Sequence, residues 1–213
     1  METNSINVND SEFLTMTSSL LSLFDSLYEK QDTEEWFTVW SSCIQETNAN
    51  NGKITILREL YCVYVLLRNK KWNIGNASKY GFHFGLYPPD MSSKVSCDGK
   101  DDENNNTARS EKTQTKKHRI HSQYIAVYDR ACPIIQNPHQ WNSFLRVSRS
   151  VTKKCCMCTF SDDDLHLIHS FDIKNLSSSK TIASIDLKCF FINKNTQIDF
   201  VDCGVTNFCY FSK

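Results

Sequence analysis

The chain has 213 residues, of which 40% are hydrophobic and 12% aromatic, enough to bury the core of one large domain or two small ones. Its 24 basic and 24 acidic side chains cancel, which excludes the strong overall basic charge of many nucleic-acid-binding domains. Any site for a polyanion must therefore be local. The ten cysteines form no series of CxxC pairs, and the longest apolar run, at 61–67, is too short to span a bilayer. We expect free thiols in a reducing compartment and no membrane partner.

Three helices are predicted in the first third of the chain, because apolar residues recur with a helical period over 11–30, 33–46 and 53–71. Thr33 is the expected N-cap of the second helix. The third ends in a basic turn, which suits the negative end of the helix dipole. The apolar face of the second helix is predicted to hold Trp36, Phe37, Trp40 and Ile44.

The middle of the chain switches to a period of two. Apolar and polar residues alternate over 80–87, which predicts a strand that ends at Tyr87, directly before a proline. Residues 88–118 are almost devoid of apolar side chains, so we expect a disordered insertion there. A second strand is predicted over 120–128, followed by a helix over 137–151.

Residues 155–160 and 165–171 are predicted to form a hairpin around the turn SDDD. Strand alternation would place Cys155 on the face opposite to Cys156 and Cys158, and no CxxC or HxxxH partner follows. These thiols are therefore interpreted as core residues rather than zinc ligands. Apolar and polar residues alternate over 175–213, but no recognisable turn sequence separates possible strands. The role of this segment stays open.

Three of these segments carry motifs: KYGFHFGLYP at 79–88, HSQY at 121–124 and SVTKKC at 150–155. In this order they resemble the catalytic subunits of the tRNA-splicing endonuclease family. The residues of the motifs are closer to those of the subunit type that cuts the 3′ splice site. The resemblance covers about 57–172. It implies an α/β (α+β) fold in which a mixed sheet is flanked by helices. The expected organisation is a helical region at 1–52, a tRNA-intron endonuclease catalytic domain at 53–174 with the insertion inside it, and an extension at 175–213.

By motif, the resemblance implies a catalytic triad of Tyr87, His121 and Lys153, with Lys154 as the nearest alternative to the lysine. The family is a metal-independent RNA lyase in which the tyrosine is usually described as the base and the histidine as the acid. The sequence supports the three groups and leaves the division of the acid and base roles open. His83 stands where relatives typically have aspartate.

Such a triad also makes chemical sense by itself. RNA cleavage by its own 2′-hydroxyl needs a base for that proton, an acid for the leaving 5′-oxygen, and a cation beside the phosphate. Histidine, with a reference pKa of about 6.5, serves either proton-transfer role, whereas tyrosine, at about 10, needs a nearby cation to ionise. Neither a metal nor a cofactor is expected.

Three basic residues, Arg146, Arg149 and Lys154, are candidates for contact with RNA phosphates. The resemblance implies that Asp162, Asp163 and Asp164 form an acidic loop that docks on a partner subunit. The expected partners are precursor tRNA and the other subunits of a nuclear heterotetrameric endonuclease. Two alternatives remain open: a non-catalytic structural subunit of the same complex, and an unrelated small RNA-binding module.

Overall fold

A computed structural model describes residues 14, 16–48, 50–88, 122–132, 138–192 and 198–201. The helices are α1 Ser18–Glu29, α2 Glu35–Thr47, α3 Asn51–Asn69, α4 Pro138–Ser150, α5 Asp162–Ser170, α6 Ile173–Leu176 and α7 Ser179–Ala183, with a 3₁₀ turn at Ser78–Tyr80. The strands are β1 Asn73–Asn76, β2 Phe84–Tyr87, β3 Tyr124–Tyr128, β4 Lys154–Thr159, β5 Lys188–Ile192 and β6 Ile198–Val201. Within these ranges, no helix combines the length and the apolar character that crossing a bilayer requires.

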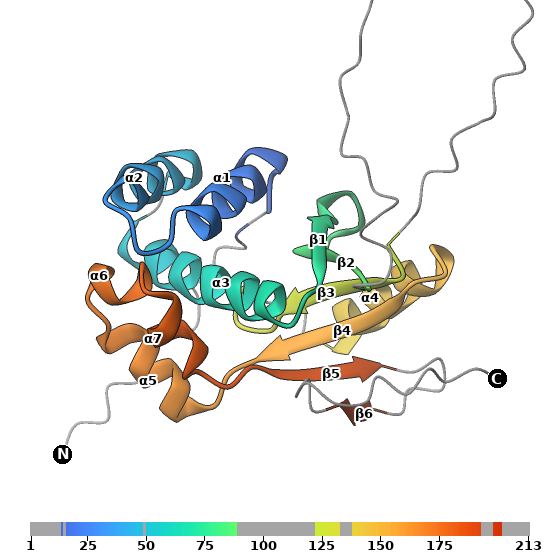
Figure 1. Ribbon diagram of the computed structural model, residues 1–213. Coiled ribbons are helices and arrows are strands. Elements are labelled where there is room, and N and C mark those ends of the chain that lie inside the picture. Colours follow the sequence, from blue (N-terminus) through green and yellow to red (C-terminus); the bar gives the residue numbers. More distant parts are fainter. Residues whose placement is uncertain are drawn as a thin grey trace, which may run out of the picture.

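The strands form one mixed sheet in the order β1-β2-β3-β4-β5-β6 (Figure 1). Every neighbouring pair is antiparallel except β3 and β4, which are parallel and are connected through α4. A parallel pair needs such a crossover, because a tight turn can only reverse the chain. The sheet and the flanking helices confirm the predicted α+β fold.

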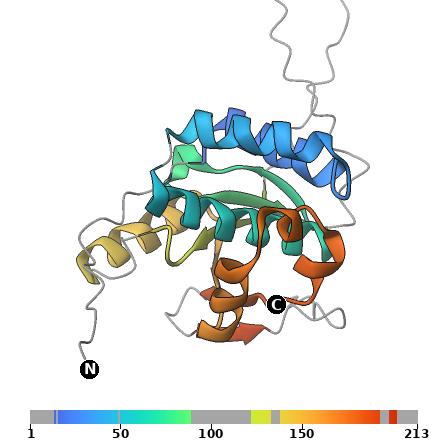
Figure 2. The ribbon, with the colours of Figure 1, turned by 90° about the vertical axis from the view of Figure 1, so that its left-hand side faces the viewer.

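The three predicted N-terminal helices are present, and α1 and α2 lie side by side over α3 (Figure 2). Thr17 caps α1 and Asn50 caps α3, each by accepting a backbone N–H with its side chain. The prediction for the start of α2 was wrong: Glu34 occupies the N-cap position, and the Thr33 hydroxyl donates instead to the carbonyl of Lys30 (2.7 Å). Phe37, expected on the buried face, is 38% exposed.

Alternate residues of the central strands enter two separate cores. Ala126 and Tyr128 of β3 join the core under α1–α3, whereas Ile125 and Val127 face the other side of the sheet. The second core is closed by Leu145 of α4, which lies behind β3 and β4 in Figure 1. The sheet is thus covered on both faces.

Two predictions about the strands were wrong. Residues 78–80 form a 3₁₀ turn that ends at Gly81 (φ 78°), so that the predicted strand begins only at Phe84, although it does end at Tyr87. The hairpin predicted around SDDD does not form either, because the second half is helix α5. β1 was not predicted from the sequence.

The segment after residue 174 contributes to the same core as the rest. β5 pairs with β4 along its whole length, and Leu176, Ile182 and Leu187 are buried in the cluster that also contains residues of α1 and α3. The predicted boundaries at 52 and 174 therefore do not separate independent cores.

Candidate functional site

Three chain segments with predicted catalytic residues meet at one end of the sheet. β2 ends at Tyr87, and its neighbour β3 runs antiparallel to it, with Leu86 opposite Tyr124. β4 runs parallel to β3, with Tyr124 opposite Lys154. The end of β2 and the beginnings of β3 and β4 consequently lie together, although they are far apart in the sequence.

Lys153 is positioned by the way α4 ends. The backbone N–H of Lys153 donates to the carbonyl of Ser148 (3.0 Å) and that of Thr152 to the carbonyl of Arg149 (3.0 Å), which is the hydrogen-bond pattern of a Schellman motif. The left-handed residue of this motif is usually glycine, but here it is Thr152, with φ 54°. A β-branched side chain is costly in this conformation. The strained turn directly precedes Lys153 and turns the chain from α4 into β4.

The Lys153 ammonium contacts Ser122. Its Nζ donates to the backbone carbonyl of Ser122 and to the Ser122 hydroxyl, where the Nζ–Oγ distance is 2.9 Å. Ser122 is the residue directly after the predicted acid His121, which lies outside the described residues. The structure therefore links Lys153 to the neighbour of His121 without describing the imidazole itself.

Two glycines leave room for the side chains of Tyr87 and Ser122. Gly75 and Gly85 are opposite each other in the β1–β2 pair. A Cβ atom at Gly75 would lie 3.0 Å from Cε2 of Tyr87, and one at Gly85 would lie 3.2 Å from Oγ of Ser122. Because both gaps are tighter than ordinary van der Waals contact, side chains at these positions would push on Tyr87 and on the anchor of Lys153.

The ring of Tyr80 forms the other boundary of the Lys153 site. The ammonium of Lys153 lies 5.6 Å from the ring centroid, and that of Lys79 lies 4.9 Å from it. Both distances are within cation–π range. Partial burial lowers the pKa of Lys153, the electrostatic effect of Tyr80 raises it, and the neighbouring positive charge of Lys79 lowers it. Lys153 is thus a cation in a partly desolvated setting.

Lys154, the alternative to Lys153, lies differently. Its ammonium is 5.5 Å from the centroid of the Tyr124 ring, and Tyr124 packs against the α1–α3 core rather than the α4 core. The two ammonium groups thus lie near different aromatic rings, and of the two only Lys153 contacts Ser122. The predicted RNA-binding residues Arg146 and Arg149 are exposed on α4, which leads directly into the Thr152 turn.

The predicted interface aspartates form the first turn of α5 rather than a hairpin loop. Asp162 and Asp163 are exposed there. Asp164 accepts hydrogen bonds from the hydroxyl of Ser161 (2.5 Å) and from the backbone N–H of Asp186 (3.3 Å). Carboxylates at a helix N-terminus stabilise the helix through its dipole, which accounts for the acidic run without a partner.

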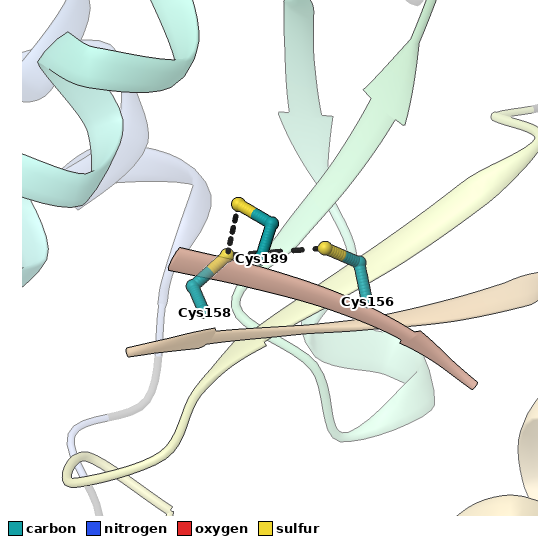
Figure 3. A group of neighbouring side chains, drawn as sticks. All are labelled: Cys156, Cys158 and Cys189. Carbon is teal, nitrogen blue, oxygen red and sulfur yellow. Dashed lines mark hydrogen bonds between the residues drawn. The ribbon is translucent and has the colours of Figure 1, made fainter. Parts of the chain in front are cut away.

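Three buried thiols lie close together on the α1–α3 side of the sheet (Figure 3). Sγ of Cys158 is 4.0 Å from Sγ of Cys156 and 3.9 Å from Sγ of Cys189, which is its cross-strand neighbour on β5. Structural zinc sites take four ligands, and in the described part of the chain no further histidine, cysteine or carboxylate joins these three. Cys155 enters the other core, as alternation predicted.

Several residues of the site carry no signal of their own in the sequence. Ser122 and Tyr80 lie inside the motifs of the catalytic resemblance, but their contacts with Lys153 depend on the pairing of distant strands. Gly75 belongs to a strand that was not predicted. Thr152 could have been recognised only from the end of α4, since threonine is not a usual residue for a left-handed cap.

Comparisons of the chain with protein-family models, with curated proteins and with solved structures find no match.

Proposed function

We propose that this protein is a catalytic subunit of a tRNA-splicing endonuclease, which cuts precursor tRNA at an intron boundary. The observation that carries the proposal is the contact of Lys153 with Ser122, because it brings the motif lysine next to the residue that follows the motif histidine. The location of Tyr87 at the same end of the sheet supports it. So do the three motifs that resemble the family.

In the proposed reaction the RNA supplies its own nucleophile. A base removes the proton of the 2′-hydroxyl, whose oxygen attacks the adjacent phosphorus, and the bond to the 5′-oxygen breaks as an acid protonates that oxygen. The products are a 2′,3′-cyclic phosphate and a 5′-hydroxyl. Tyr87 and His121 would carry the two proton transfers, with the tyrosine as base and the histidine as acid in the family's usual description.

Lys153 would bind the phosphate whose charge grows during the attack. Its ammonium donates to two oxygens of Ser122, which restrict its position before a substrate arrives. A cation fixed in advance stabilises developing charge without the cost of reorganisation. The third donor hydrogen of the ammonium stays available to a phosphate oxygen.

The nuclear location, the heterotetramer and the docking of Asp162–Asp164 on a partner subunit belong to the same proposal. The exposed side chains of Asp162 and Asp163 are compatible with contact to a basic surface. Arg146 and Arg149, exposed on the helix that leads to Lys153, would contact the RNA backbone.

The test is the replacement His121→Ala in the complex reconstituted with its partner subunits. Loss of a general acid or base typically lowers the rate by about 10²–10⁴-fold, so cutting at one splice site should fall to background while precursor tRNA still binds. Gel analysis of the products, with identification of the cyclic phosphate, provides the measurement. His166→Ala is the matched control, since His166 is exposed on α5.

Unchanged cutting at both splice sites by the His121→Ala complex would refute a catalytic role and leave the structural subunit as the interpretation. The RNA-module alternative predicts a different result. In that case the chain would purify without endonuclease subunits and bind RNA of other kinds tightly.

A further inference from the structure

Two lysine ammonium groups lie near the aromatic ring of Tyr80. Lys79 Nζ is 4.9 Å and Lys153 Nζ is 5.6 Å from its centroid. The ring itself packs against the core that contains Phe82 and Ile125, and the 3₁₀ turn that carries it ends at a left-handed glycine. The ring is therefore held by the fold, and the lysines are organised around a fixed group.

Among the described residues, the two lysines have no acidic partner. In the part of the chain that the structure describes, no carboxylate lies within ion-pair distance of either ammonium. The two positive charges repel each other, and the charge of Lys79 contributes to lowering the pKa of Lys153. Two like charges that share one ring are unfavourable in the free protein and become favourable when an anion binds between or beside them.

The two lysines also differ in exposure, so that one lies further inside the protein and the other closer to solvent. Lys153 is partly buried and hydrogen-bonded to Ser122, whereas Lys79 is exposed to solvent. A chain of phosphates that places one group at Lys153 would therefore continue outward past Lys79. RNA has this repeating charge along its backbone.

We propose that Lys79, supported by the ring of Tyr80, binds a second backbone phosphate of the RNA, next to the phosphate held by Lys153. This inference rests on the proposed function, because it takes the Lys153 site to be a phosphate site. It adds a binding residue that the catalytic motif does not include. Lys79 would contribute to RNA affinity and to its dependence on salt.

The experiment measures binding without cleavage. The complex is titrated with a precursor tRNA that has a 2′-deoxy group at the scissile position, over a series of salt concentrations. Lys79→Gln should weaken binding about fivefold at low salt, the effect of losing one exposed charge contact. The slope of log affinity against log salt should become shallower by about 0.7, because one phosphate contact fewer releases fewer counterions. Lys180→Gln, at an exposed lysine of α7, is the matched control and should change neither quantity.

Variants of Tyr80 test whether its aromatic ring supports the binding of phosphate by Lys79. Tyr80→Phe keeps the aromatic face and should bind like the wild type, whereas Tyr80→Leu should reproduce the loss seen with Lys79→Gln. An unaltered salt slope for Lys79→Gln overturns the inference, and the proposed function then still stands if His121→Ala abolishes cutting. If the slope changes but the wild-type complex does not cut unmodified precursor tRNA, the phosphate contact is supported and the proposed reaction is refuted.

Discussion

The imidazole of His83 is fully buried just before β2, where its Nδ1 accepts the backbone N–H of Tyr128 (3.1 Å). A ring nitrogen that accepts a hydrogen bond carries no proton, so this histidine is neutral in the folded protein. Burial lowers the pKa of His83 to about 4, against a smaller upward effect of a hydrogen bond with the backbone of Leu14. His83, which lies inside the first of the three motifs, is thus a core residue.

This burial predicts a loss of stability in acid. The folded-state pKa lies below the ordinary value of about 6.5, so the unfolded chain binds more protons between these two values. The contribution of His83 is complete above about pH 6.5 and falls as the pH drops toward about 4, by about 3 kcal/mol in all. Urea unfolding at a series of pH values measures this slope.

His83→Asn provides the comparison, because the asparagine side-chain oxygen can accept the Tyr128 N–H but has no proton to gain in this range. The variant should lose the part of the slope that His83 causes, while the carboxylates keep theirs. Identical slopes for wild type and variant would show that His83 titrates normally in the folded state.

At the scale of elements, one buried carboxylate connects a helix, a strand and a second helix. Glu59 of α3 has a fully buried side chain, and its Oε2 accepts the hydroxyl of Tyr128 at the end of β3 (2.6 Å). Its Oε1 is 2.6 Å from Nε2 of His169 on α5 and 3.7 Å from Nη1 of Arg130. Burial, together with the charge of Glu59, raises the pKa of Tyr128, which stays a hydrogen-bond donor.

A double-mutant cycle tests this network. Tyr128→Phe should cost about 2 kcal/mol of unfolding free energy, because it removes a hydrogen bond to a buried charged group. Once Glu59→Gln is present the same change should cost about 1 kcal/mol less, since the two residues contact each other. Chemical denaturation of the four proteins gives both values.

Tyr61→Phe is the control for this cycle. The Tyr61 hydroxyl accepts from Gln31 and Trp36 and does not contact Glu59. Its effect should therefore add to that of Glu59→Gln. Additive effects of Tyr128→Phe and Glu59→Gln as well would mean that the network contributes no coupling energy.

Helix α5 was predicted as a strand, and this error shows what limited the prediction of secondary structure. Residues 165–171 were interpreted as the second strand of a hairpin. Leu165 and Ile168 are buried while Leu167 is 46% exposed, which is the helical pattern. The sequence did contain the start signal, since Ser161 with three following aspartates forms an N-cap and an acidic first turn. The long helices α1–α3 were predicted because their periodicity extends over many residues. β1 has four half-buried residues, too few for a pattern.

At the scale of the whole molecule, the candidate site was predictable in its residues but not in its contacts. The motifs named Tyr87 and Lys153, and the structure places both residues at one end of the sheet. The link through Ser122 and the ring of Tyr80 depends on which strands pair and in which register. That information lies in tertiary packing, as does the position of Cys189 beside Cys158.

The continuity of the core past residue 174 also predicts the effect of truncation. A chain that ends at residue 174 loses β5 and the buried side chains of Leu176, Ile182 and Leu187, and exposes the edge of β4. We expect no cooperative thermal transition by circular dichroism. A chain that ends at residue 201 keeps every described element and should melt cooperatively. A cooperative transition for the shorter chain would show that residues 1–174 form an independent domain.

The absence of a side chain at Gly75 has a spectroscopic consequence. The ring of Tyr87 lies directly on the Gly75 backbone, with its Cε2 only 3.0 Å from where a Cβ would be. A proton close to an aromatic ring experiences the ring current, and the α-protons of Gly75 should therefore resonate away from ordinary glycine positions. Any movement of Tyr87 would change that signal. Gly75 thus provides a natural NMR reporter of Tyr87, and no label at the site is needed to observe it.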